Sequence, residues 1–172
     1  MKIFVTGLTS LHKGRMEFGN AGNYYIAAPF FREIRRLRPN AEIATTLQFS
    51  EEFCAANDLK TLPLHSYYAW REDDQDLSAA LREYAIAQIF CETGSLVDVT
   101  AFLSQGCNSD LVIFFHGDMW GDNADANGQD RFIVDLLKMR TAQLLGCKTA
   151  MMASSPGPVT AEKTLDLAKR AY

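Results

Sequence analysis

The sequence predicts an α/β fold: a Rossmann-like, mostly parallel sheet with helices on both faces. Short runs rich in β-branched and aromatic residues alternate with amphipathic stretches, which is the pattern of β-α-β units. One run, Asp110–His116, holds five consecutive apolar residues, so this strand must be covered on both faces. The 172 residues, 48% of them hydrophobic, can bury a substantial core, and we expect one domain over residues 1–172.

Five strands are predicted from the runs of strand-forming residues. They are Lys2–Thr6, Ala41–Gln48, Leu59–Leu64, Asp110–His116 and Lys148–Ala153. Gly7 is expected to end the first strand. Pro63 weakens the third strand because proline cannot donate a hydrogen bond to a sheet ladder.

Six helices are predicted, most of them from apolar residues at three- and four-residue steps. They are Asn23–Leu37, Glu51–Asn57, Leu77–Glu92, Leu96–Gln105, Arg131–Leu145 and Thr160–Tyr172. Ser50 is expected to cap the second helix and Gly146 to end the fifth. Pro29 predicts a kink or a late start in the first helix, whose last turns carry arginines typical of a solvated helix end.

Charge and composition argue against several classes of protein. A net charge of −4 and a pI near 5.4 give no electrostatic reason to expect nucleic-acid binding. No apolar run approaches the roughly 20 residues of a membrane span, and no secretory signal is recognisable, so we expect a cytoplasmic protein. The four cysteines lie far apart and are expected to be reduced thiols rather than a zinc site.

Three polar loops are predicted to leave the strands at the carboxyl edge of the sheet, where parallel sheets bind ligands. The first precedes a helix and could bring N–H groups to an anion through Gly19, Asn20, Gly22 and Asn23. The alternative for this loop is a flexible turn whose asparagine caps the helix. A later loop, Ser154-Ser155-Pro156-Gly157-Pro158, offers hydroxyl and N–H groups to an anionic or sugar ligand.

The remaining loop begins with His116 and Asp118. An imidazole and a carboxylate two residues apart at the end of a buried strand can do acid–base chemistry or hold a polar substrate. A structural histidine bonded to a backbone group fits His116 equally well. Met119 stands where lipase-like esterases with a G-D-S block carry their nucleophile, which excludes that chemistry. Val134 stands where a calcium loop needs glutamate, so Asp122–Asp130 is better interpreted as a solvated loop.

The three loops follow one another in a recognisable order. An N-terminal strand precedes Gly19-Asn20-Ala21-Gly22-Asn23, which opens a helix, and Asp110–Asp118 forms a strand with a glycine-containing turn. A helix ending in Leu-Leu-Gly, Ala142–Gly146, leads through a strand to Ser154-Ser155-Pro156-Gly157-Pro158. In this order and spacing the chain resembles the N-terminal half of the polysaccharide pyruvyl transferase family.

The resemblance implies the N-terminal half of a two-domain, GT-B-like architecture, and the last helix, still periodic where the sequence stops, fits that expectation. It implies transfer of a pyruvyl group from phosphoenolpyruvate to a sugar of a polysaccharide or cell-surface glycan, without a metal or organic cofactor. His116 and Asp118 would be catalytic. Gly117 and the two other loops would contact the acceptor: Gly19, Asn20, Gly22, Asn23, Ser154, Ser155 and Gly157. A homo-oligomer is compatible with this expectation.

Two other functions stay open at this point. The first is a nucleotide-sugar glycosyltransferase of the same GT-B-like architecture, which a screen of donors would separate from a pyruvyl transferase. The second is a non-catalytic, flavodoxin-like binding domain, which would be stable and monodisperse alone. Half of a two-domain protein would instead expose an apolar interface and aggregate.

Overall fold

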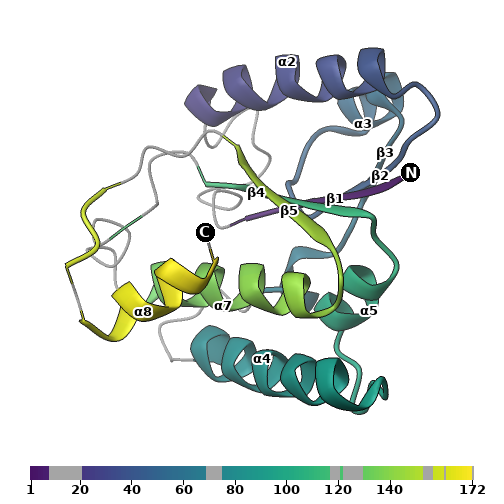
Figure 1. The fold of residues 1–172 in the computed structure, drawn as a ribbon. Coiled ribbons are helices and arrows are strands. Elements are labelled where there is room, and N and C mark those ends of the chain that lie inside the picture. The colour runs from purple at the N-terminus through teal and green to yellow at the C-terminus, as the bar shows by residue number, and fades with distance from the viewer. Residues whose placement is uncertain are drawn as a thin grey trace.

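A computed structural model describes residues 1–7, 21–68, 75–116, 121, 130–152, 157–160 and 162–171. Its centre is a five-stranded parallel sheet with the strand order β3-β2-β1-β4-β5 (Figure 1). The strands are β1 (Lys2–Thr6), β2 (Glu42–Thr45), β3 (Leu59–Thr61), β4 (Leu111–Phe115) and β5 (Lys148–Met152). The predicted α/β class with a parallel sheet is therefore confirmed.

Helices cover both faces of this sheet, as Figure 1 shows. One face carries α2 (Ala21–Leu37) and α3 (Glu51–Asn57). The other carries α4 (Gln75–Thr93), α5 (Ala101–Cys107), α7 (Arg131–Leu144) and α8 (Glu162–Ala171). A short 3-10 helix, η1 (Leu64–Ser66), follows β3. We call these the α2 face and the α7 face.

The chain changes direction at the centre of the sheet. It builds outward from β1 through β2 to β3, then crosses back to place β4 on the other side of β1. The carboxyl ends of β1 and β4 thus lie side by side while their connections diverge. In doubly wound sheets this topological switch point is where ligands bind.

The ends of β1 and β4 approach closely enough to require glycine at position 7. Gly7 has φ +151°, and a Cβ added there would lie 2.1 Å from the carbonyl oxygen of Phe115. The nearest atoms belong to the backbone of Phe115, so no side-chain movement could make room for a Cβ at position 7. This contact fixes the end of the central strand against its neighbour at the switch point.

Several predicted boundaries are corrected by the structure. The strand predicted over Ala41–Gln48 is shorter, and that predicted over Leu59–Leu64 stops at Thr61, before Pro63 begins η1. The helix predicted over Leu96–Gln105 begins only at Ala101. Asp98 adopts a left-handed φ of +56°, which no helix accommodates, and Thr100 caps the helix by accepting a hydrogen bond from the Leu103 N–H.

The prediction that Pro29 delays the first helix is wrong. The helix begins at Ala21 and continues through Pro29 to Leu37. Pro29 lies on the exposed side of α2, so water can bond the carbonyl that the missing proline N–H leaves unpaired. The predicted Ser50 cap and Gly146 stop are confirmed: Ser50 Oγ accepts from the Phe53 N–H at 3.1 Å, and Gly146 has φ +88°.

None of the helices in the described part of the chain is long and apolar enough to span a membrane.

Candidate active site

A group of buried polar side chains lies at the switch point, and we call it the carboxyl-edge cluster. Its members come from the ends of three strands, from the segment after η1 and from α7, and each is at most 1% exposed. They are Thr6, Thr46, Tyr68, His116 and Asp135. Polar groups are seldom buried without a partner, so their contacts define what the cluster can do.

The three strand-end members extend rows of side chains that face α7. Side chains alternate across a strand, so Thr6 follows Phe4, Thr46 follows Ala44 and His116 follows Phe114 on the same face. The His116 ring stacks on Phe114 with centroids 5.9 Å apart. The strands therefore bring these polar groups together one step beyond the apolar core.

His116 and Asp135 form the centre of the cluster. His116 Nδ1 lies 2.8 Å from Asp135 Oδ2, and neither side chain is exposed. The pair has hydrogen-bonding length, although its alignment is imperfect. Hydrogen bonds at catalytic sites often align only when substrate is bound. A carboxylate at Nδ1 favours the tautomer with its proton on Nδ1 and its lone pair on Nε2, which is the arrangement of a general base.

The other oxygen of Asp135 is held by Tyr68. The Tyr68 hydroxyl donates to Asp135 Oδ1 at 3.1 Å. Burial, and then the negative charge of Asp135, raise the pKa of Tyr68 well above its ordinary value of 10.0, so this hydroxyl keeps its proton. The Thr6 hydroxyl donates to the Tyr68 oxygen at 3.4 Å and lies 3.0 Å from the Thr46 hydroxyl.

The helix α7 supplies Asp135 from a stripe of charged residues that is itself buried. Arg131, Asp135 and Lys138 are spaced by four and three residues, so they share one side of α7. Lys138 Nζ lies 2.8 Å from Glu83 Oε2 on α4, and the Thr100 hydroxyl donates to Glu83 Oε1 at 2.6 Å. Burial lowers the pKa of Arg131, while Asp135 and Asp76 act in the opposite direction.

Four of the predicted site residues lie in the described part of the chain: Gly22, Asn23, His116 and Gly157. His116 lies in the carboxyl-edge cluster. Asn23 lies in the first turn of α2, within the helix predicted to begin there, and Gly22 lies in the same turn rather than in the preceding loop. Six other predicted residues lie outside the described part of the chain: Gly19, Asn20, Gly117, Asp118, Ser154 and Ser155.

The backbone of Gly157 lies close to that of Gly121. A Cβ added to Gly121 would lie 2.8 Å from the Gly157 carbonyl carbon and 2.9 Å from the Pro158 oxygen, and Gly121 has φ +104°. Positions that follow β4 and β5 are therefore packed backbone to backbone. A close approach of this kind requires glycine at position 121 whether or not a ligand binds nearby.

Sequence analysis missed four members of the cluster: Thr6, Thr46, Tyr68 and Asp135. The alternation of side chains along β1 and β2 could have placed both threonines on the α7 face. The three- and four-residue spacing of charges within the apolar α7 sequence could have singled out Asp135. No local sequence pattern could have identified Tyr68, because it contacts Asp135, which lies 67 residues away in the sequence.

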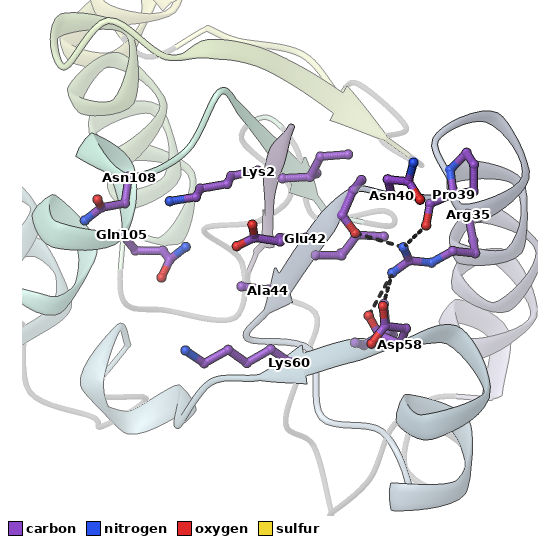
Figure 2. Close-up of a pocket in the computed structure, with 14 residues that line it drawn as sticks. Lys2, Arg35, Pro39, Asn40, Glu42, Ala44, Asp58, Lys60, Gln105 and Asn108 are labelled. Carbon is purple, nitrogen blue, oxygen red and sulfur yellow. Dashed lines mark hydrogen bonds and ion pairs between the residues drawn. The ribbon is translucent and has the colours of Figure 1, made fainter.

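A groove lies at the opposite edge of the sheet. Figure 2 shows this groove of about 790 Å³, with Lys2, Glu42 and Lys60 extending from the sheet toward Gln105 on α5. Its far wall is built around Arg35. Parallel sheets place catalytic groups at the carboxyl ends of their strands, whereas this groove lies at the amino ends. The carboxyl-edge cluster is therefore the candidate active site.

Arg35 is a structural residue of this groove, which corrects its interpretation as part of a solvated helix end. Its guanidinium donates at 2.8 Å to the carbonyls of Pro39, Ala41 and Asp58, and at 3.2 Å to that of Asn57. It thereby ties the end of α2 to the starts of β2 and β3 (Figure 2).

Comparison with known proteins gives no match: no protein-family profile fits the chain, and no curated protein or solved structure is significantly similar to it. Within the described residues, no three His, Cys, Asp or Glu side chains gather to form a metal site. The chemistry that the described cluster offers is acid–base chemistry at His116, supported by a buried carboxylate.

Proposed function

We propose that this chain is the acceptor-side domain of a transferase of the polysaccharide pyruvyl transferase type, with His116 as the general base. The observation that carries the proposal is the buried His116–Asp135 pair at the switch point of the sheet. The order of the loop motifs, which resembles that family, supplies the reaction. The donor is phosphoenolpyruvate, and the acceptor is a sugar of a polysaccharide or cell-surface glycan.

In this reaction one sugar hydroxyl adds to C2 of phosphoenolpyruvate. His116 Nε2 accepts the proton of that hydroxyl, and the resulting imidazolium delivers a proton to C3, which becomes a methyl group. A second hydroxyl of the sugar then displaces phosphate from C2 and closes a pyruvate ketal, and its proton leaves with the phosphate. Asp135 stabilises the imidazolium that forms between these steps.

The remaining predicted residues have supporting roles in this proposal. Asp118, two residues beyond His116 in the sequence, polarises the attacking hydroxyl. Gly22 and Asn23, at the N-terminal end of α2, bring N–H groups toward the ligand. A second, GT-B-like domain facing the carboxyl edge would bind the phosphate and carboxylate of the donor. Because His116 has no exposed surface, this edge must open when the acceptor binds.

That burial also favours a second candidate, a non-catalytic binding domain in which the His116–Asp135 pair only stabilises the fold. The two candidates differ in one measurable outcome. A transferase consumes phosphoenolpyruvate in the presence of a suitable sugar, whereas a binding domain only retains a ligand.

The test uses the full-length gene product with phosphoenolpyruvate and a panel of sugar glycosides, measuring phosphate release and the mass of the product. Nucleotide sugars are offered in parallel as alternative donors. We expect His116→Ala to lower kcat by about 10²–10⁴-fold, the usual value of general acid–base catalysis. Asp135→Asn should lower it by up to about 10⁴-fold because it disturbs the histidine tautomer.

Lys60→Ala is the matched control, because Lys60 is exposed and lies in the groove at the opposite edge. It should leave kcat unchanged. Full activity of His116→Ala would refute the assignment of the base. Turnover of nucleotide sugars alone would make the protein a glycosyltransferase, and binding without turnover of any donor would favour the binding domain.

A further inference from the structure

The hydroxyl groups of the carboxyl-edge cluster form a chain that ends on Asp135. Thr46 and Thr6 are 3.0 Å apart, Thr6 donates to Tyr68 at 3.4 Å, and Tyr68 donates to Asp135 Oδ1 at 3.1 Å. A carboxylate can only accept, so Asp135 is the fixed end of the chain. Because Thr6 gives its proton to Tyr68, Thr46 must be the donor in the Thr46–Thr6 contact.

Every proton in this chain therefore points toward Asp135. Hydrogen bonds arranged head to tail polarise one another, and the effect is larger where water is excluded. Tyr68 remains a donor because burial and the Asp135 charge raise the pKa of its hydroxyl well above 10.0. The chain thus delivers a hydrogen bond to one oxygen of Asp135 and leaves the other oxygen directed at His116 Nδ1.

The Tyr68 side chain is itself held in place from several sides. Its backbone N–H donates to the Leu64 carbonyl at 2.9 Å, which fixes the residue at the end of η1. Lys138 Nζ lies 5.0 Å from the centroid of the Tyr68 ring, and Glu83 anchors that ammonium at 2.8 Å. A ring fixed in this way cannot swing its hydroxyl away from Asp135 without losing its contact with the Lys138 ammonium.

We propose that Tyr68 is a positioning residue: its hydroxyl, supported by Thr6 and Thr46, holds the Asp135 carboxylate so that Oδ2 meets His116 Nδ1 and the imidazole lone pair stays on Nε2. The catalytic part of this inference rests on the proposed function, since it concerns the same histidine. The tautomer of His116 does not depend on that function and can be measured in a protein with no known substrate.

The test compares Tyr68→Phe with Tyr67→Phe. Each variant removes one hydroxyl from one of two adjacent buried tyrosines, but the hydroxyl bonded to Asp135 is that of Tyr68, whereas the Tyr67 ring packs against Phe4 with centroids 5.6 Å apart. Two-dimensional ¹H–¹⁵N spectra of the full chain report which imidazole nitrogen of His116 carries the proton. We expect Tyr68→Phe to lower the ratio of the Nδ1–H to the Nε2–H tautomer by about tenfold or more, the value of a hydrogen bond to a charged group.

The kinetic arm uses phosphoenolpyruvate and the sugar identified for the wild type. Tyr68→Phe should lower kcat by about tenfold or more and leave KM unchanged, since Tyr68 touches Asp135 rather than substrate. Tyr67→Phe should change neither the tautomer ratio nor kcat. Thr46→Val, at the far end of the chain, should shift the tautomer in the same direction by a smaller factor, and it carries the test if Tyr68→Phe does not fold.

An unchanged tautomer ratio in folded Tyr68→Phe would overturn the inference, and so would an equal shift in Tyr67→Phe. The proposed function can fail separately. If wild-type protein turns over no phosphoenolpyruvate but Tyr68→Phe shifts the tautomer, the positioning role stands without that reaction. If the wild type is active and Tyr68→Phe keeps both its tautomer and its kcat, the reaction stands and the positioning role is wrong.

Discussion

The two faces of the sheet bury different kinds of side chain. On the α2 face, aromatic rings pack against one another: Phe49 stacks on Phe53 with centroids 4.5 Å apart, and Phe31 meets Phe49 edge-on at 5.5 Å. On the α7 face, ionisable groups are buried among the apolar side chains. Among the described residues, the buried charged side chains and His116 all lie on this face: Glu83, His116, Arg131, Asp135 and Lys138.

The aromatic side chains of the α2 face serve stability, whereas the ionisable side chains of the α7 face surround the candidate site. Buried rings stabilise a fold by leaving water and by ring–ring contacts, and they need no partners of opposite charge. Buried ions cost free energy to desolvate and recover it only when they are paired and hydrogen-bonded. A protein retains such groups where they perform a task, and here they surround the histidine of the candidate site.

The largest effect is expected from breaking the buried ion pair of the α7 face. Lys138→Met leaves Glu83 charged, 4% exposed and without its ammonium partner, so we expect a loss of about 3–5 kcal/mol in the free energy of unfolding. Urea denaturation measures this loss. The double variant Glu83→Leu/Lys138→Met should recover most of it because no unpaired charge remains. A loss below about 1 kcal/mol in the single variant would mean that the two faces do not differ in this way.

A smaller effect is expected on the α2 face. Phe31→Leu keeps the site apolar and removes ring contacts with Phe49 and Phe53, which should lower the free energy of unfolding by about 1–2 kcal/mol. The same denaturation experiment checks it. Activity should be unchanged, because Phe31 is buried on the face opposite His116. A loss larger than that of Lys138→Met would reverse the comparison.

At neutral pH the smallest effect on stability is expected from Cys147, a thiol buried on the α7 face. Burial, as the main cause, raises the pKa of Cys147 from 9.0 to about 11, so below pH 9 it adds no pH dependence to stability. Between pH 9 and about 11 the unfolded chain releases this proton while the folded chain keeps it, so the free energy of unfolding falls as pH rises. Unfolding at several alkaline pH values should show a shallower fall in Cys147→Ala.

The same shift predicts slow alkylation of this thiol. Raising the pKa of Cys147 from 9.0 to about 11 reduces the thiolate fraction at neutral pH about 100-fold, and the thiolate is the reactive form. Exposed Cys91 should therefore react with iodoacetamide well before Cys147, as peptide mass mapping would reveal. Equal rates for the two thiols would contradict the burial of Cys147.

The sequence was informative where structure depends on neighbouring residues. The apolar run before His116 predicted both a covered strand and a polar group at its end, and Ser50 predicted a helix start. These features depend on side-chain alternation and on local hydrogen bonds, which the order of residues determines directly.

Features that depend on packing between distant segments were not predicted. Asp135 lies in an apolar helical pattern, and its partner Tyr68 is brought to it only when η1 docks against α7. Arg35 was interpreted as solvated because its carbonyl partners come together only when the starts of β2 and β3 meet the end of α2. Periodicity identifies which side of an element is buried but not which polar group it meets there.

The place of β1 in the sheet has a consequence for folding. The central strand, β1, precedes the other described strands in the sequence, yet its second neighbour, β4, begins at Leu111, and the Lys2 N–H donates to the Asp110 carboxylate across 108 residues. Pairs this distant in sequence close large loops, which slows folding. On the ribosome, β1 must therefore keep one edge open until β4 has emerged, and an open strand edge invites aggregation. A chaperone that shields β1 should accordingly raise the yield of folded protein more than one acting on α8.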